Sequence, residues 1–217
     1  MTSVPDLAEP VAGWRVWDLA ETREGPLLVS PLRPVFWPPR RPMTATCSRG
    51  CAPSPSLPCR CGLYAMDELP RLHRESRGQG RVVGCTALWG RVVEHAHGFR
   101  AQFAYPLLLF LLPAGRPGVS QRLLRRRPLP DVGYGLPAAT EVSSASPAEP
   151  ARRLKQHYGV PVVVPSGSPA DGYFPDDRLA GAVAAEAVRG LAGRREGDHT
   201  AHARFADAVE DLVGRRW

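Results

Sequence analysis

The sequence predicts an α+β fold: a small, curled antiparallel β-sheet or barrel with a stapled loop, followed by a helical C-terminal part. Three observations predict it. Strand-like runs of alternating apolar residues fill the first half of the 217-residue chain. Four of the five cysteines stand together. Helical spacing of apolar residues is strongest near the C-terminus. We expect a β-rich domain at 1–112, a Pro/Gly/Ser-rich linker at 113–150 and a mainly helical segment at 151–217.

The first third of the chain predicts short strands interrupted by prolines. GWRVWDLA (13–20) alternates as a strand does, PLLVS (26–30) is a second strand, and the EGP between them is typical of a turn, so a hairpin is expected. PLRPVFWPPRRP (31–42) cannot be a central strand, because proline donates no hydrogen bond to a neighbouring strand. It should follow the surface, with Phe36 and Trp37 turned inward.

The clearest local pattern is a long hairpin. RVVGCTALWGRVVEH (81–95) and FRAQFAYPLLLFLL (99–112) are strand-like runs joined by AHG, in which Gly98 can take the positive φ of a tight turn. Gly84 and Gly90 interrupt the first run and predict bulges or bends. Such bends are what a sheet needs to curl into a small barrel.

Helices are predicted at four places. The segment 66–80 contains a short helix or turn followed by a loop, and 147–159 is a helix that ends on a glycine. A short buried strand, VPVVVP, follows at 160–165. Two amphipathic helices at 176–193 and 202–217 could pack against each other as an antiparallel pair.

The chain is basic, with a formal charge of +7 and a pI near 9.6. This balance ordinarily indicates nucleic acid or anionic lipid as a partner. However, 27 of the 28 basic residues are arginine and Lys155 is the lone lysine, as the codons of a GC-rich genome would produce. Part of the positive charge therefore reflects codon usage and does not indicate an anionic binding partner.

Membrane insertion and secretion are not expected. The longest apolar run, LLLFLL at 107–112, has the length of a strand and falls far short of the roughly twenty residues of a membrane span. The N-terminal MTSVPDLAEPVAG has neither the basic start nor the apolar stretch of a secretion signal. A cytoplasmic protein is predicted.

The cysteine cluster has the pattern C-x3-C-x7-C-x-C, formed by Cys47, Cys51, Cys59 and Cys61. Four thiolates would repel one another without a cation between them, whereas zinc prefers four such ligands at tetrahedral positions. Bound metal would contribute roughly 10 kcal/mol of folding free energy. A zinc-stapled loop is therefore predicted, and the full shell of thiolates argues against catalytic zinc.

Other uses of the cysteines stay open. An iron–sulfur cluster is the second choice, and a redox or catalytic cysteine is the third. Disulfides are disfavoured because a cytoplasmic compartment is reducing. Cys85, inside a strand-like run, is expected to be a small buried residue with no part in the cluster.

Other groups of residues have a functional and a structural interpretation. Glu94, His95 and His97 could form a two-histidine, one-carboxylate metal site, but neighbours in a strand point to opposite faces, so a solvated turn is favoured. Tryptophans could stack a base, a sugar or a methylated amine, but core packing is favoured. The four are Trp14, Trp17, Trp37 and Trp89.

Three functional hypotheses follow. The first is a non-catalytic, zinc-stabilised adaptor that binds another protein through the stapled loop, Trp37 and the turn at His97. The second is a nucleic-acid-binding protein, whose candidate phosphate contacts are Arg122, Arg125, Arg126 and Arg127. The third is an enzyme with a site in the β domain near Glu94, His95 or His97.

The motifs GWRVW, CRCGLYA and LWGRVVEHAHGFRAQFAYP, with the later YGVPV, together resemble an uncharacterised protein family from GC-rich bacteria. The resemblance covers residues 13–112 and the stretch around Tyr158. In that family a histidine often occupies the position of Cys51, and an exchange between two zinc ligands implies a metal site. The resemblance implies no activity.

Overall fold

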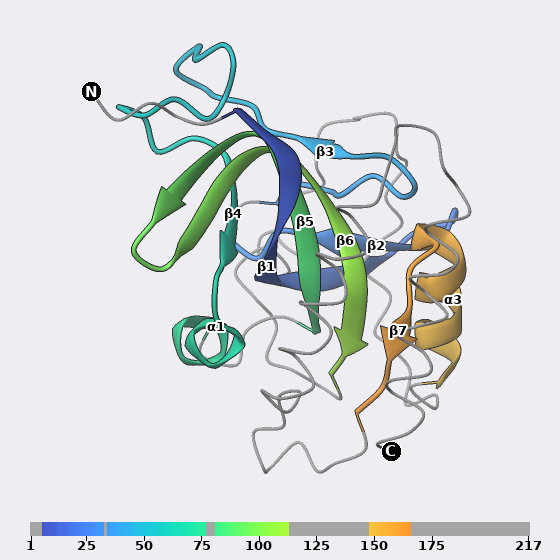
Figure 1. Ribbon diagram of the computed structural model, residues 1–217. Coiled ribbons are helices and arrows are strands. Elements are labelled where there is room, and N and C mark those ends of the chain that lie inside the picture. The colour runs from blue at the N-terminus through green and yellow to red at the C-terminus, as the bar shows by residue number, and fades with distance from the viewer. Residues whose placement is uncertain (1–5, 33, 77–80, 113–147, 166–217) are drawn as a thin grey trace.

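We describe residues 6–32, 34–76, 81–112 and 148–165 in a computed structural model of the chain (Figure 1). Residues 113–147 of the predicted linker and both predicted C-terminal helices lie outside this set. In chain order the elements are β1 (Asp6–Glu21), β2 (Pro26–Val29), β3 (Met43–Thr44), β4 (Leu63–Met66), α1 (Leu69–Ser76), β5 (Val82–His95), β6 (Gly98–Leu111), α3 (Ala148–Tyr158) and β7 (Val162–Val163).

Four antiparallel strands pair in a closed ring. β1 pairs with β5, β5 with β6, β6 with β4, and β4 returns to β1 through the single pair Trp14 and Met66. β2 extends the ring as a hairpin from β1, with the turn at Thr22 and Gly25 closed by two backbone hydrogen bonds. The prediction of a curled antiparallel sheet with a few helices is therefore confirmed for the described residues.

The β5–β6 hairpin is the central piece of the sheet. Its register shifts twice, between Cys85 and Thr86 and between Trp89 and Val92, beside the two glycines for which the sequence predicts bulges. Figure 1 shows both strands bending sharply as they cross the top of the molecule. The bend lets one hairpin form a wall of the ring and also project beyond it.

Gly98 shows why the hairpin turn requires glycine. Its φ is +138°, and a Cβ placed on it would lie 2.2 Å from the Ala65 carbonyl oxygen and 2.7 Å from the Met66 Cα. β4 therefore crosses the base of the turn so closely that a side chain at this position cannot fit.

The larger core cluster joins the sheet to α3. Trp17 and Trp37 meet edge to face with ring centroids 5.2 Å apart, and both are almost fully buried. α3 adds Leu154 and Tyr158 to this cluster, and β7 pairs in parallel with β6. Residues 148–165 thus pack in the same core as the sheet, beside β6 in Figure 1.

A second core cluster lies against α1. It contains Trp14, Val83 and Phe110, and the helix contributes Leu69 and Leu72. The expectation that the tryptophans serve core packing is confirmed for Trp14, Trp17 and Trp37, which are at most 4% exposed. Trp89 is half-buried and packs against this second cluster. Within the part of the chain that the structure describes, no helix has the length and apolar character to span a bilayer.

Candidate metal centre

The loop that carries the four cysteines is held at both ends by the same strand. β3, before the loop, pairs with β6 at Phe103 and Ala104, and β4, after it, pairs with β6 from Gly98 to Ala101. The loop thus leaves the sheet and returns to it a few residues away. In Figure 1 it forms the projecting coil above β3 and β4.

The sulfur atoms of Cys47, Cys51, Cys59 and Cys61 lie within 4.8 Å of one another, and all four residues are half-buried. The sulfurs of Cys47 and Cys59 are 3.7 Å apart, and the structure contains all five cysteines as free thiols. Among the described residues this is the group of donors that could hold a metal ion, and it brings together every cysteine that the spacing predicts.

Two tight turns aim the ligand pairs at each other. In the first, Gly50 N–H donates to the Cys47 carbonyl at 3.1 Å and Arg49 N–H donates to the Cys47 sulfur at 3.4 Å. In the second, Cys59 N–H donates to the Ser56 carbonyl at 3.1 Å. Backbone N–H groups directed at a sulfur stabilise its thiolate form, which is the form that binds metal.

The thiols are electrostatically coupled. Backbone hydrogen bonds from Cys51 and Arg49 lower the pKa of Cys47 to about 6. Hydrogen bonds to the sulfurs of Cys47 and Cys59 raise the pKa of Cys51 to about 12. Ionisation of Cys47 is therefore favoured, and ionisation of its neighbour Cys51 is disfavoured. A divalent cation in the centre would stabilise all four thiolates.

Arg100 of β6 lies beneath the second turn and is 3% exposed. Its Nη1 donates to the carbonyls of Cys59 and Cys61, at 2.9 Å for Cys61, and to that of Ser56 at 3.5 Å. No pattern in the sequence predicts a role for Arg100 in the site. The one sequence feature that distinguishes Arg100 is its charge, because the strand around it is largely apolar.

Gly62 allows the loop to return to the sheet over Arg100. Its φ is +127°, and an added Cβ would lie 3.0 Å from the Arg100 Cβ and 3.1 Å from the Pro55 Cβ. A larger residue here would push the second pair of cysteines away from β6.

The remaining residues for which the sequence gives a prediction fall into three sets. Glu94, His95 and His97 are exposed at the hairpin turn. Burial and the nearby Arg100 cation lower the pKa of His95, whose Nε2 accepts a hydrogen bond from Arg100. Cys85 is fully buried, and burial raises its pKa to about 12, as expected for an inert thiol.

The candidate phosphate contacts lie outside the described residues: Arg122, Arg125, Arg126 and Arg127.

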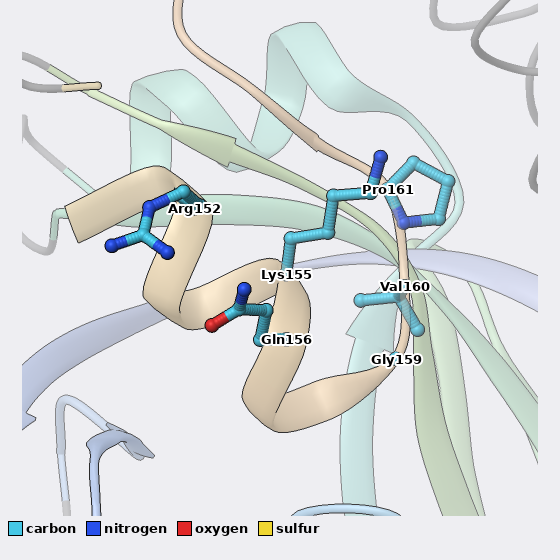
Figure 2. Close-up of a pocket in the computed structure, with 6 residues that line it drawn as sticks. All are labelled: Arg152, Lys155, Gln156, Gly159, Val160 and Pro161. Atoms are coloured by element: carbon cyan, nitrogen blue, oxygen red, sulfur yellow. The ribbon is translucent and has the colours of Figure 1, made fainter. Parts of the chain in front are cut away.

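A pocket of about 450 Å³ lies at the end of α3, between the helix and the segment leading to β7 (Figure 2). It is lined by Arg152, Lys155, Gln156, Gly159, Val160 and Pro161. The Arg152 guanidinium is paired with Glu149 at 2.8 Å. None of the residues for which the sequence predicts a function lines this pocket.

No protein-family model, no curated protein and no solved structure matches the chain. The resemblance to a family from GC-rich bacteria therefore stays a prediction, and the chemistry of the site has to be argued from its own residues.

Proposed function

We propose that the four cysteines bind one structural zinc ion and that the protein is a non-catalytic binding protein. The gathering of four thiol sulfurs within 4.8 Å carries this proposal. Around a tetrahedral zinc ion with Zn–S bonds of about 2.3 Å, sulfurs lie about 3.8 Å apart. The 3.7 Å between Cys47 and Cys59 supports that geometry.

The number and type of ligands support a structural role. Four thiolates complete the shell of a tetrahedral ion, so no position is left for a water molecule or a substrate. An iron–sulfur cluster places a larger body of iron and sulfide between its ligands, so the close approach of these sulfurs favours a single ion. The ion would fix the proline-rich loop over β6.

The proposed partner is another protein, which would contact the stapled loop. Leu57, within the loop, is 49% exposed, and Tyr64, directly after it on β4, is 47% exposed. Exposed large apolar residues beside a rigid loop are typical of recognition surfaces. Trp37 does not belong to this surface, because it is 1% exposed, which corrects its place in the sequence-based hypothesis.

Elemental analysis and an absorption spectrum test the metal. We expect about one zinc per chain in the wild type and loss of zinc in Cys59→Ser. Cys85→Ala is the matched control, because it removes the cysteine outside the cluster and should keep the zinc. If the protein contains iron and absorbs visible light, the site binds iron and the zinc assignment is wrong. If freshly reduced wild-type protein contains no metal, the proposal is refuted.

Photo-crosslinking in cells tests the binding role. A photoreactive residue at Leu57 should give one defined protein adduct, and the same residue at the exposed Arg152 of α3 should not. The adduct should disappear when Cys59→Ser is added, because the loop would no longer be fixed. An adduct equally strong from both positions, or one that survives the loss of zinc, would contradict recognition by the stapled loop.

The nucleic-acid and enzyme hypotheses stay predictions. Binding through Arg122, Arg125, Arg126 and Arg127 would weaken steeply with added salt, because phosphate contacts release counterions. An enzyme site at the hairpin turn would lose its activity in His95→Ala.

A further inference from the structure

Arg100 is a buried cation without a carboxylate partner among the described residues. Its 3% exposure takes the guanidinium out of water, and its donors go to three carbonyls of the loop and to the His95 ring at 2.5 Å. Carbonyl dipoles solvate a buried cation only partly, so such a group is costly unless negative charge lies nearby. The described ion pairs, by contrast, are found at α3.

The proposed zinc centre supplies that charge. One Zn²⁺ with four thiolates carries a net charge of −2, and two of the thiolates belong to Cys59 and Cys61, whose carbonyls bind Arg100 Nη1. A guanidinium fixed beside these residues offsets the excess negative charge. It also holds both backbone segments in one orientation, from which both sulfurs join the cluster.

We propose that Arg100 is a positioning residue of the metal centre, which orients Cys59 and Cys61 and neutralises part of the charge of the zinc–thiolate group. This inference rests on the proposed function. It assigns unequal support to the two ligand pairs: Cys59 and Cys61 depend on β6 through Arg100, whereas Cys47 is supported by backbone N–H groups of its own turn.

The test measures zinc affinity by competition with a chromophoric chelator, using the full chain. Removing an outer partner of a metal site typically weakens binding about 10- to 100-fold, and we expect this range for Arg100→Met. Arg100→Lys keeps the charge but has a single nitrogen, so it cannot bind the loop carbonyls and the His95 ring together, as Nη1 and Nε of Arg100 do. It should therefore recover only part of the affinity. If Arg100→Met does not fold, Arg100→Lys decides, and its affinity should still fall below that of the wild type.

A second readout separates positioning from general destabilisation. In the zinc-loaded variants, alkylation mapped by mass spectrometry should speed up at Cys59 and Cys61 more than at Cys47 and Cys51. If zinc affinity is unchanged, or if alkylation accelerates equally at both pairs of cysteines, the proposed role of Arg100 is wrong while the proposed zinc site still stands. A wild type that binds no zinc would instead overturn the proposed function, so the two failures are distinguishable.

Discussion

The Tyr158 hydroxyl donates a hydrogen bond to the Trp37 carbonyl at 2.7 Å, which joins residues 121 positions apart in the chain. The same hydroxyl accepts a hydrogen bond from Leu28 N–H at 2.9 Å, and the side chain is 1% exposed. One buried oxygen thus satisfies two backbone groups of the β2 region. α3 is held to the sheet by this polar contact as well as by apolar packing.

Tyr158→Phe should therefore be costly. It leaves the Leu28 N–H and the Trp37 carbonyl buried without this partner, and an unsatisfied buried group costs about 1–3 kcal/mol. Urea unfolding should show a loss of that size. Tyr64→Phe is the matched control, because its hydroxyl bonds to the Arg60 carbonyl on the exposed surface. Equal losses in the two variants would contradict the role of the buried hydroxyl.

Stability should fall at alkaline pH. Burial raises the pKa of Tyr158 above its ordinary value and that of Cys85 to about 12. The unfolded chain ionises these groups near pH 10 and 8.5. Raised folded values stabilise the fold below the unfolded pKa, and this contribution is lost as pH rises through the folded pKa.

The free energy of unfolding should accordingly decline from pH 8 upward. It is best measured in Cys59→Ser, which removes zinc binding from the balance, and against the same background the three remaining cluster thiols contribute equally to both curves. Adding Tyr158→Phe and Cys85→Ala should make the decline shallower. A decline of the same steepness in that variant would show that other groups control the alkaline response.

Gly62→Ala should disturb the metal centre more than Gly50→Ala does. Both glycines have positive φ, +127° and +76°, but a Cβ at Gly50 would have nothing within 4 Å. Gly50→Ala should cost about 1–2 kcal/mol for the left-handed conformation alone. Gly62→Ala adds close contacts of 3.0 Å with the Arg100 Cβ and 3.1 Å with the Pro55 Cβ, so these neighbours must shift by a few tenths of an ångström. It should therefore also weaken zinc binding in a chelator competition. Similar zinc affinities in the two variants would argue against the crowding.

Removal of zinc should loosen the loop before the sheet. The segments on either side pair with β6, and those pairings do not involve the cysteines. After treatment with a chelator, amide exchange should accelerate across residues 46–62 and change much less in β5 and β6. Uniform acceleration through the hairpin would show that zinc supports the whole fold.

Local patterns were predictable from the sequence. The β5–β6 hairpin is predicted by the alternation of apolar and polar residues and by Gly98 at the turn, both of which are local features. The cysteine group is predicted by its spacing. Arg100 was not predictable as part of the site, because its carbonyl partners lie 39 to 44 positions away. The closure of the ring at Trp14 and Met66 and the partners of Tyr158 were hidden for the same reason. Such contacts depend on how distant segments meet, which no local pattern records.

β6 has a consequence for the order of folding. β6 pairs with β3, β4, β5 and β7. Of these four strands, β5 is the one that lies next to β6 in the sequence. Closing a short loop costs less entropy than closing a long one, so this hairpin should form first and serve as the template for the other strands. Zinc capture would then be a late event, and stopped-flow refolding should show the hairpin forming at a rate that does not depend on zinc concentration.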